Sequence, residues 1–162
     1  MLSILFVCLG NICRSPMAEG IFLEILKREK ENSNFEVDSA GLLSYHQGEL
    51  PDSRMRYFAG KRSYMLNHRS RPFSRKDFEM FDMIIGMDDQ NIAGLKQLAI
   101  TLEEQAKIYR MTDFCRKLEA THVPDPYYGG EKGFENVIDL LEDACEGLYN
   151  EIVERRSSVT FH

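Results

Sequence analysis

The chain lacks the features of a membrane-spanning, secreted or zinc-finger protein. No apolar run approaches the roughly 20 residues that a helix needs to cross a bilayer. The apolar run at residues 2–9 is too short for a signal peptide and has no basic flank. The 4 cysteines form no disulfide-like framework, and the spacing of Cys8 and Cys13 has no matching second pair that would indicate zinc. We therefore expect a cytoplasmic protein with no membrane partner, no metal and no other cofactor.

A surplus of positive charge is also missing. The 20 Lys and Arg against 26 Asp and Glu give a net charge of −6, which argues against nucleic acid as a partner. The distribution is uneven, because residues 54–76 carry only basic charges and residues 131–154 carry acidic ones with a single exception, Lys132. Two solvated helix faces explain such runs. The alternative is that the basic segment attracts anionic phosphoproteins.

The pattern along the chain indicates one α/β domain. The length of 162 residues, 43% hydrophobic and 28% charged, is typical of one globular domain, and we find no repeat or linker. Strand-like runs at 2–8, 35–39, 83–87 and 106–111 alternate with helical patterns at 15–31, 52–66, 89–99 and 134–155. This alternation predicts a four-stranded parallel sheet flanked by helices on both faces, with a phosphate-binding loop after the first strand. We expect the domain to span residues 1–156 and a C-terminal tail to occupy 157–162.

The segment from Cys8 to Pro16 carries the strongest chemical signal. It reads Cys-Leu-Gly-Asn-Ile-Cys-Arg-Ser-Pro and lies between the first strand and the first helix. Gly10 and Asn11 tolerate unusual backbone angles, so the N–H groups of the loop can turn inward and form an anion site at the helix N-terminus. Such a site favours the thiolate form of Cys8, and the planar guanidinium of Arg14 can hold two phosphate oxygens. The segment therefore predicts a thiolate-based phosphate-ester hydrolase.

Residues 7–19 resemble the signature loop of the low-molecular-weight protein tyrosine phosphatases. Further motifs follow in the order of that family over essentially the whole chain: Asp38-Ser-Ala-Gly, Pro51-Asp-x-Arg, His68-x-Ser-Arg, Met87-Asp-x-x-Asn and Asp125-Pro-Tyr-Tyr-Gly. The resemblance implies hydrolysis of protein phosphotyrosine through a phosphocysteine intermediate, with a tyrosine-phosphorylated protein as substrate. We expect Cys8 to be the nucleophile, Arg14 to bind phosphate, and Asp125 to serve as general acid and then as general base. The expected phosphate-binding residues are Leu9, Gly10, Asn11, Ile12, Cys13 and Arg14.

Several residues are candidates for supporting these groups. Ser15 can donate a hydrogen bond to the sulfur of Cys8. The resemblance further implies that Asp88 restrains Arg14 and that side-chain hydrogen bonds brace the loop. The expected bracing residues are Asn11, Ser39 and His68. The expected aromatic rim that selects the phosphotyrosine ring consists of Tyr45, Tyr127 and Tyr128.

Cys13 has two possible roles. It could trap an oxidised Cys8 as a disulfide and so prevent further oxidation. The alternative is an inert small side chain packed under the loop.

Three other functions use the same scaffold. Arsenate reductases need further cysteines after the third strand, and residues 78–98 contain none. In protein-arginine phosphatases a Thr stands where this chain has Ile12, whose apolar side chain suits a phenyl ring better than a guanidinium. A catalytically silent phosphotyrosine-binding module would need neither the nucleophile nor the acid. We therefore favour the phosphotyrosine phosphatase, and we expect a monomer.

Overall fold

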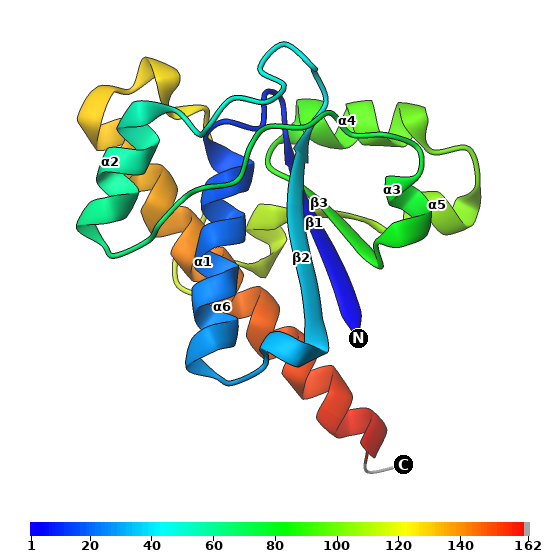
Figure 1. The fold of residues 1–162 in the computed structure, drawn as a ribbon. Helices are drawn as coiled ribbons and strands as arrows, with labels where there is room; N and C mark the ends of the chain where they lie inside the picture. The colour runs from blue at the N-terminus through cyan, green and yellow to red at the C-terminus, as the bar shows by residue number, and fades with distance from the viewer. Residues whose placement is uncertain (161–162) are drawn as a thin grey trace.

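A four-stranded parallel sheet lies between two layers of helices in the computed structural model, which describes residues 1–160 (Figure 1). The strands are β1 (Leu2–Cys8), β2 (Phe35–Gly41), β3 (Met83–Gly86) and β4 (Ile108–Arg110). Their order across the sheet is β2-β1-β3-β4, and all pairs are parallel. The predicted α/β fold with a four-stranded parallel sheet is confirmed.

The central strand β1 explains why the sheet is covered on both sides. Its side chains alternate between the faces, and Ile4 to Val7 are all fully buried. Ile4 and Phe6 belong to the larger core cluster, whereas Leu5 and Val7 belong to the smaller cluster on the opposite face. The same alternation places Cys8, the last residue of the strand, with the larger cluster.

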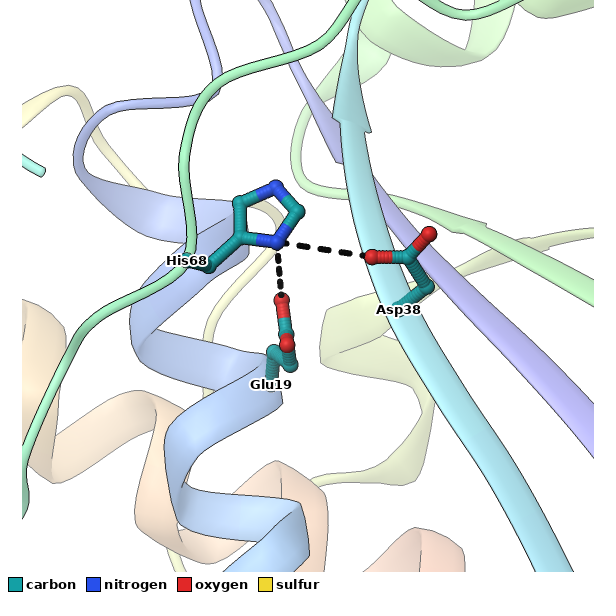
Figure 2. A group of neighbouring side chains, drawn as sticks. All are labelled: Glu19, Asp38 and His68. Atoms are coloured by element: carbon teal, nitrogen blue, oxygen red, sulfur yellow. Dashed lines mark ion pairs between the residues drawn. The ribbon is translucent and has the colours of Figure 1, made fainter. Parts of the chain in front are cut away.

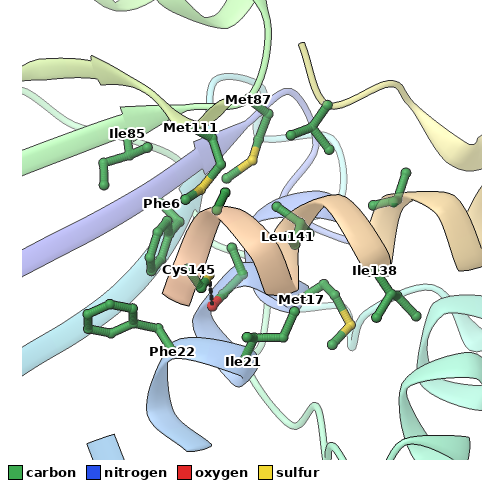
Figure 3. Packing of buried hydrophobic residues seen from close by; sticks show 14 of the residues in the cluster. Phe6, Met17, Ile21, Phe22, Ile85, Met87, Met111, Ile138, Leu141 and Cys145 are labelled. Atoms are coloured by element: carbon green, nitrogen blue, oxygen red, sulfur yellow. Dashed lines mark hydrogen bonds between the residues drawn. The ribbon is translucent and has the colours of Figure 1, made fainter. Parts of the chain in front are cut away.

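Helices α1 (Arg14–Arg28), α2 (Ser53–Lys61) and α6 (Gly130–Thr160) cover the face of the larger cluster. Figure 3 shows the apolar side chains of α1 and α6 packed against Phe6 and the neighbouring strands. Helices α3 (Asp77–Met80) and α4 (Asp89–Leu98) cover the other face, and the short helix α5 (Leu102–Ala106) precedes β4. Short 3-10 turns occur at Asn32–Asn34, Met111–Phe114 and Pro126–Tyr128. No helix in this part of the chain combines the length and apolar character that a bilayer crossing needs.

The helix bounds differ from the sequence-based prediction most clearly at four places. Helix α1 ends at Arg28 rather than at 31. Helix α2 ends at Lys61 rather than at 66, and Ser63 then takes the left-handed conformation with φ of 66°. Helix α5 was not predicted, although Thr101 and Glu104 form a capping box at its start. Helix α6 begins at Gly130 instead of 134 and continues to Thr160, past residue 157 where the tail was expected to begin.

The basic and acidic segments face each other in the fold. Arg62 at the end of α2 contacts three carboxylates of α6, those of Glu135, Asp139 and Glu142, at 2.6–2.8 Å. These ion pairs connect the end of α2 to α6. Part of the basic segment therefore pairs with acidic side chains of α6 instead of facing solvent.

Candidate active site

The loop from Leu9 to Cys13 joins β1 to α1 at the carboxyl edge of the sheet. Strand β1 lies between β2 and β3. From β1 the chain continues through α1 to β2, and from β3 it continues through α4 to β4 on the opposite side, so the loop emerges between two connections that run in opposite directions. Ligands of open parallel sheets bind at such a point. The fold therefore places the segment with the strongest chemical signal at the position where a ligand site is expected.

The carbonyl groups of this loop point outward. The carbonyl oxygens of Cys8 and Leu9 accept hydrogen bonds from the N–H groups of Leu42 and Leu43, at 3.1 and 2.9 Å. The hydroxyl of Ser70 and the N–H of Asp52 donate to the carbonyls of Gly10 and Ile12, at 3.1 and 2.8 Å. By contrast, the N–H groups of residues 9–13 have no acceptor among the described residues. A ring of free donors beside a helix N-terminus can bind an anion such as phosphate.

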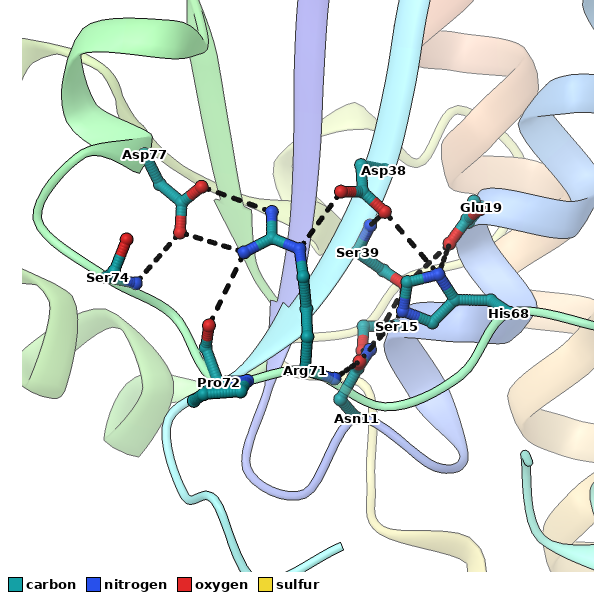
Figure 4. A network of polar contacts seen from close by, with 10 residues as sticks. All are labelled: Asn11, Ser15, Glu19, Asp38, Ser39, His68, Arg71, Pro72, Ser74 and Asp77. Atoms are coloured by element: carbon teal, nitrogen blue, oxygen red, sulfur yellow. Dashed lines mark hydrogen bonds and ion pairs between the residues drawn. The ribbon is translucent and has the colours of Figure 1, made fainter. Parts of the chain in front are cut away.

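Asn11 holds the loop in this conformation. It is buried and has a φ of 57°, in the left-handed region that Asn tolerates better than most residues. Its carboxamide oxygen accepts hydrogen bonds from the backbone N–H of Arg71 and from Nε2 of His68, both at 3.0 Å. Its amide group donates to the hydroxyls of Ser15 and Ser39, at 2.7 and 3.0 Å (Figure 4). All the hydrogen-bonding capacity of this carboxamide is used, so its position is fixed.

The bond between Asn11 and Ser15 orients a hydroxyl group toward the sulfur. Ser15 Oγ accepts from the Asn11 amide and lies 3.0 Å from Cys8 Sγ. Its own hydrogen is therefore free to point at the sulfur. A donor at this position stabilises a negative charge on Cys8.

Arg14 is buried at the start of α1 and is held from two sides. Its Nη1 donates to Asp88 Oδ2 at 2.6 Å and to the carbonyl oxygen of Val123 at 3.0 Å. Burial opposes the charge, but Cys8 and Asp88 raise the pKa of Arg14, so the guanidinium stays protonated. Its remaining donors have no acceptor among the described residues, which leaves them free for an anion.

A cleft of about 600 Å³ opens above the loop. Cys8, Arg14, Ile12 and Asp125 line it together, so the expected nucleophile, anion-binding arginine and general acid share one cavity. Asp125 is exposed and accepts a hydrogen bond from the N–H of Tyr127 at 3.0 Å, which fixes one of its carboxylate oxygens.

Two of the three tyrosines that were expected at the rim lie at the cleft. Tyr45 and Tyr127 line the cleft and are 85% and 57% exposed. The side chain of Tyr128 lies outside the described part of the chain. Exposed rings at a cleft mouth can stack on an aromatic substrate group.

Cys13 also lines the cleft. Burial, with a contribution from Asp52, raises the pKa of the Cys13 thiol well above its ordinary value. Cys13 is therefore held as a thiol, which is a poor nucleophile. Its role in trapping an oxidised Cys8 stays a prediction.

Three features of the cleft did not emerge from the sequence. The first is the backbone carbonyl of Val123, which no sequence motif could reveal because every residue has a carbonyl. The second is the ion pair of His46 and Glu49 on the rim, beside Tyr45. Their i, i+3 spacing was the available signal. The third is the position of Asp52, which the sequence indicated only as part of the Pro51-Asp-x-Arg motif, and which lines the cleft and also caps α2.

Comparison with known proteins identifies the family. The family model described as low molecular weight phosphotyrosine protein phosphatase matches residues 3–158. This chain belongs to that family. It is therefore an enzyme, a phosphatase that hydrolyses phosphoric monoesters.

Three relatives are informative. A crystal structure of a protein tyrosine phosphatase from Entamoeba histolytica is 46% identical, covers 96% of this chain and 99% of its own, and has a TM-score of 0.93. The low molecular weight phosphotyrosine protein phosphatase of Gallus gallus is 37% identical and is matched over 90% of this chain and 92% of its own. The Drosophila arginine phosphatase is 32% identical, covers 92% of this chain and 96% of its own, and has a TM-score of 0.85.

Proposed function

We propose that this phosphatase hydrolyses phosphotyrosine in proteins through a phosphocysteine formed on Cys8. The observation that carries the proposal is the single cleft that Cys8, Arg14 and Asp125 line together, above a loop whose N–H groups are free. In this arrangement the loop amides and Arg14 bind the phosphoryl oxygens. The nucleophile lies at the base of the cleft, and the acid lies at its edge.

In the first step the Cys8 thiolate attacks phosphorus and the bond to the tyrosine oxygen breaks. Asp125 donates a proton to the departing phenoxide, so the product leaves as a neutral tyrosine side chain. The loop amides and the free donors of Arg14 stabilise the charge on the three equatorial oxygens. Because these donors are already in position, they require little reorganisation as the charge develops.

In the second step water attacks the phosphocysteine. Asp125, now a carboxylate, takes a proton from this water, and the phosphorus–sulfur bond breaks to release inorganic phosphate. The hydroxyl of Ser15, 3.0 Å from Cys8 Sγ, stabilises the departing thiolate. The same hydrogen bond supports the nucleophile in the first step.

The walls of the cleft favour an aromatic leaving group. Ile12, Leu43 and Leu50 contribute apolar surface, and Tyr45 and Tyr127 contribute rings. An apolar wall favours a phenyl group, whereas a phosphoguanidinium group would need polar partners. The similarity to the Drosophila arginine phosphatase makes phosphoarginine the second candidate, because both substrates fit the same fold.

The test compares phosphate release from a phosphotyrosine peptide and a phosphoarginine protein, with chelator present, for wild type, Cys8→Ser and the control Cys115→Ser. We expect turnover of phosphotyrosine at least tenfold faster than of phosphoarginine. Cys8→Ser should abolish it, and Cys115→Ser, in a residue that does not line the cleft, should retain it. A preference for phosphoarginine would show that the argument from Ile12 is wrong. Turnover by Cys8→Ser would exclude the proposed nucleophile.

A further inference from the structure

A second, smaller groove lies beside the catalytic cleft. Helix α2 lies beside the first turns of α6 (Figure 1), and residues of both helices line the groove. Its volume is about 370 Å³, and its walls include the aromatic side chains of Tyr57, Phe58 and Phe134. Ser53 lines both the groove and the cleft, so the two hollows adjoin at the start of α2. The groove is therefore within reach of a substrate that is bound in the cleft.

The side chain of Arg54 forms the boundary between the groove and the cleft. Its Cζ lies 4.8 Å from the ring centroid of Tyr127, which lines the cleft, and 4.9 Å from that of Phe134, which lines the groove. Cation–π attraction to both rings holds the guanidinium in this position. Because the same side chain contacts a ring of each hollow, a single extended ligand can enter both.

Tyr57 offers the groove an aromatic surface that is open to solvent. The residue is 60% exposed, whereas Phe58 is buried. The ring of Tyr57 packs edge-on against that of Phe58, with the centroids 5.1 Å apart, and Nζ of Lys61 lies 4.8 Å from its centroid. These contacts restrict the orientation of the ring and leave much of its surface accessible. An exposed ring that is held in place can pack against an apolar group of a ligand.

The groove suits an apolar side chain better than a charged one. Three of the seven residues that line it are aromatic, and its two charged residues, Arg54 and Glu131, have opposite signs. Gly130 also lines the groove, and a Cβ at this position would meet no atom within 4 Å, so the space beside it is open. An apolar side chain that enters the groove is removed from water, which favours binding in proportion to the area buried.

An extended peptide can fill the cleft and the groove together. Side chains two positions apart in an extended chain point to the same side and lie roughly 7 Å apart. A peptide whose phosphotyrosine enters the cleft therefore presents the residue two positions before or after it to the same face of the protein, where the groove adjoins the cleft. We propose that the groove binds an apolar side chain at such a position and that Tyr57 selects it, an inference that rests on the proposed function.

The test compares kcat/KM for phosphotyrosine peptides that carry Leu or Ser two positions before or after the phosphotyrosine and are otherwise identical. We expect Leu to raise kcat/KM at least about fivefold over Ser at one of these positions. Tyr57→Ala should reduce this ratio to below about twofold, whereas Tyr57→Phe, which keeps the ring, should retain it. Both variants should hydrolyse p-nitrophenyl phosphate at the wild-type rate, because this substrate has no peptide to reach the groove.

Met65→Ala is the matched control, because Met65 is an exposed apolar residue outside the groove, and it should keep the wild-type ratio. Equal kcat/KM for the Leu and Ser peptides at both positions, or a ratio that Tyr57→Ala leaves unchanged, would overturn this proposal and leave the proposed function in place. Hydrolysis of p-nitrophenyl phosphate without turnover of any phosphotyrosine peptide would overturn both. A change of oligomeric mass in Tyr57→Ala, measured by light scattering, would show that a second copy of the chain covers the groove and would also overturn the proposal.

Discussion

Asp88 contacts Arg14 and also stabilises the fold, and two substitutions of Asp88 can separate these two effects. One carboxylate oxygen accepts from Arg14 at 2.6 Å, and the other caps α4 by accepting from the N–H of Asn91 at 2.8 Å. Asp88→Ser keeps a side chain that caps helices well but cannot reach Arg14, whereas Asp88→Ala removes both interactions. The two variants should therefore lose similar activity but different amounts of stability.

The magnitudes follow from these two interactions. A hydrogen bond between charged groups contributes about 1.5–3 kcal/mol. If that free energy is lost from the transition state, kcat/KM falls by roughly 10- to 150-fold, since about 1.4 kcal/mol corresponds to a factor of ten. The bond from Arg14 to Val123 remains and favours the lower end of the range. Loss of the cap should cost Asp88→Ala about 0.5–2 kcal/mol more of unfolding free energy than Asp88→Ser.

The assay is kcat/KM on an aryl phosphate together with urea unfolding of both variants. Wild-type kcat/KM in Asp88→Ser would refute the claim that Asp88 positions Arg14. Equal stability of the two variants would refute the assignment of Asp88 as the cap of α4.

Three further predictions concern the loop, the core and the acid. Asn11→Ala should lower kcat, and its free energy of unfolding in urea should be at least about 1 kcal/mol lower than that of Asn11→Gly, because only glycine adopts the positive φ without strain. Equal free energies of unfolding would contradict this prediction. Gly147→Ala should lower the free energy of unfolding by about 1–3 kcal/mol, since the new Cβ would lie 1.8 Å from the carbonyl oxygen of Phe114. An unchanged thermal midpoint would contradict this, because it would mean that the backbone segments around Gly147 and Phe114 move apart at little cost. Arg54 Cζ lies 4.8 Å from the ring centroid of Tyr127, so Arg54→Ala should loosen the loop of Asp125 and lower kcat/KM for phenyl phosphate about 2- to 5-fold. The kcat/KM for p-nitrophenyl phosphate, which reports the first step and whose leaving group needs no acid there, should be unchanged; equal losses of kcat/KM on both substrates would refute this role.

The parts of the fold that could be predicted are those fixed by local sequence. The apolar run of β1 and the Gly10-Asn11 pair can each be interpreted from neighbouring residues alone. The structure has the strand at the expected residues and Asn11 in the left-handed conformation. The end of α2 was placed too late, because Ser63 adopts a positive φ without the glycine that usually signals such an end. The capping box of α5 lay in the sequence but was not recognised.

The parts that could not be predicted depend on residues far apart in the chain. Arg62 meets the carboxylates of α6 more than 70 positions away, and nothing near Arg62 indicates that contact. Glu19 has the sequence environment of a charged helix residue, but the fold buries it against Ser39 and His68 (Figure 2). In both cases the partners meet only when the separate elements of the fold pack together, which a local pattern does not encode.

The most direct test of the proposed chemistry is to trap the phosphorylated enzyme. Wild type, Cys8→Ser and Asp125→Asn are mixed with p-nitrophenyl phosphate, quenched in detergent within milliseconds and analysed by mass spectrometry of the peptide that contains residues 8–14. We predict a phosphoryl group on Cys8 in wild type, more of it in Asp125→Asn because the second step lacks its base, and none in Cys8→Ser. Turnover without a phosphorylated Cys8, or with the phosphoryl group on another residue, would contradict the mechanism.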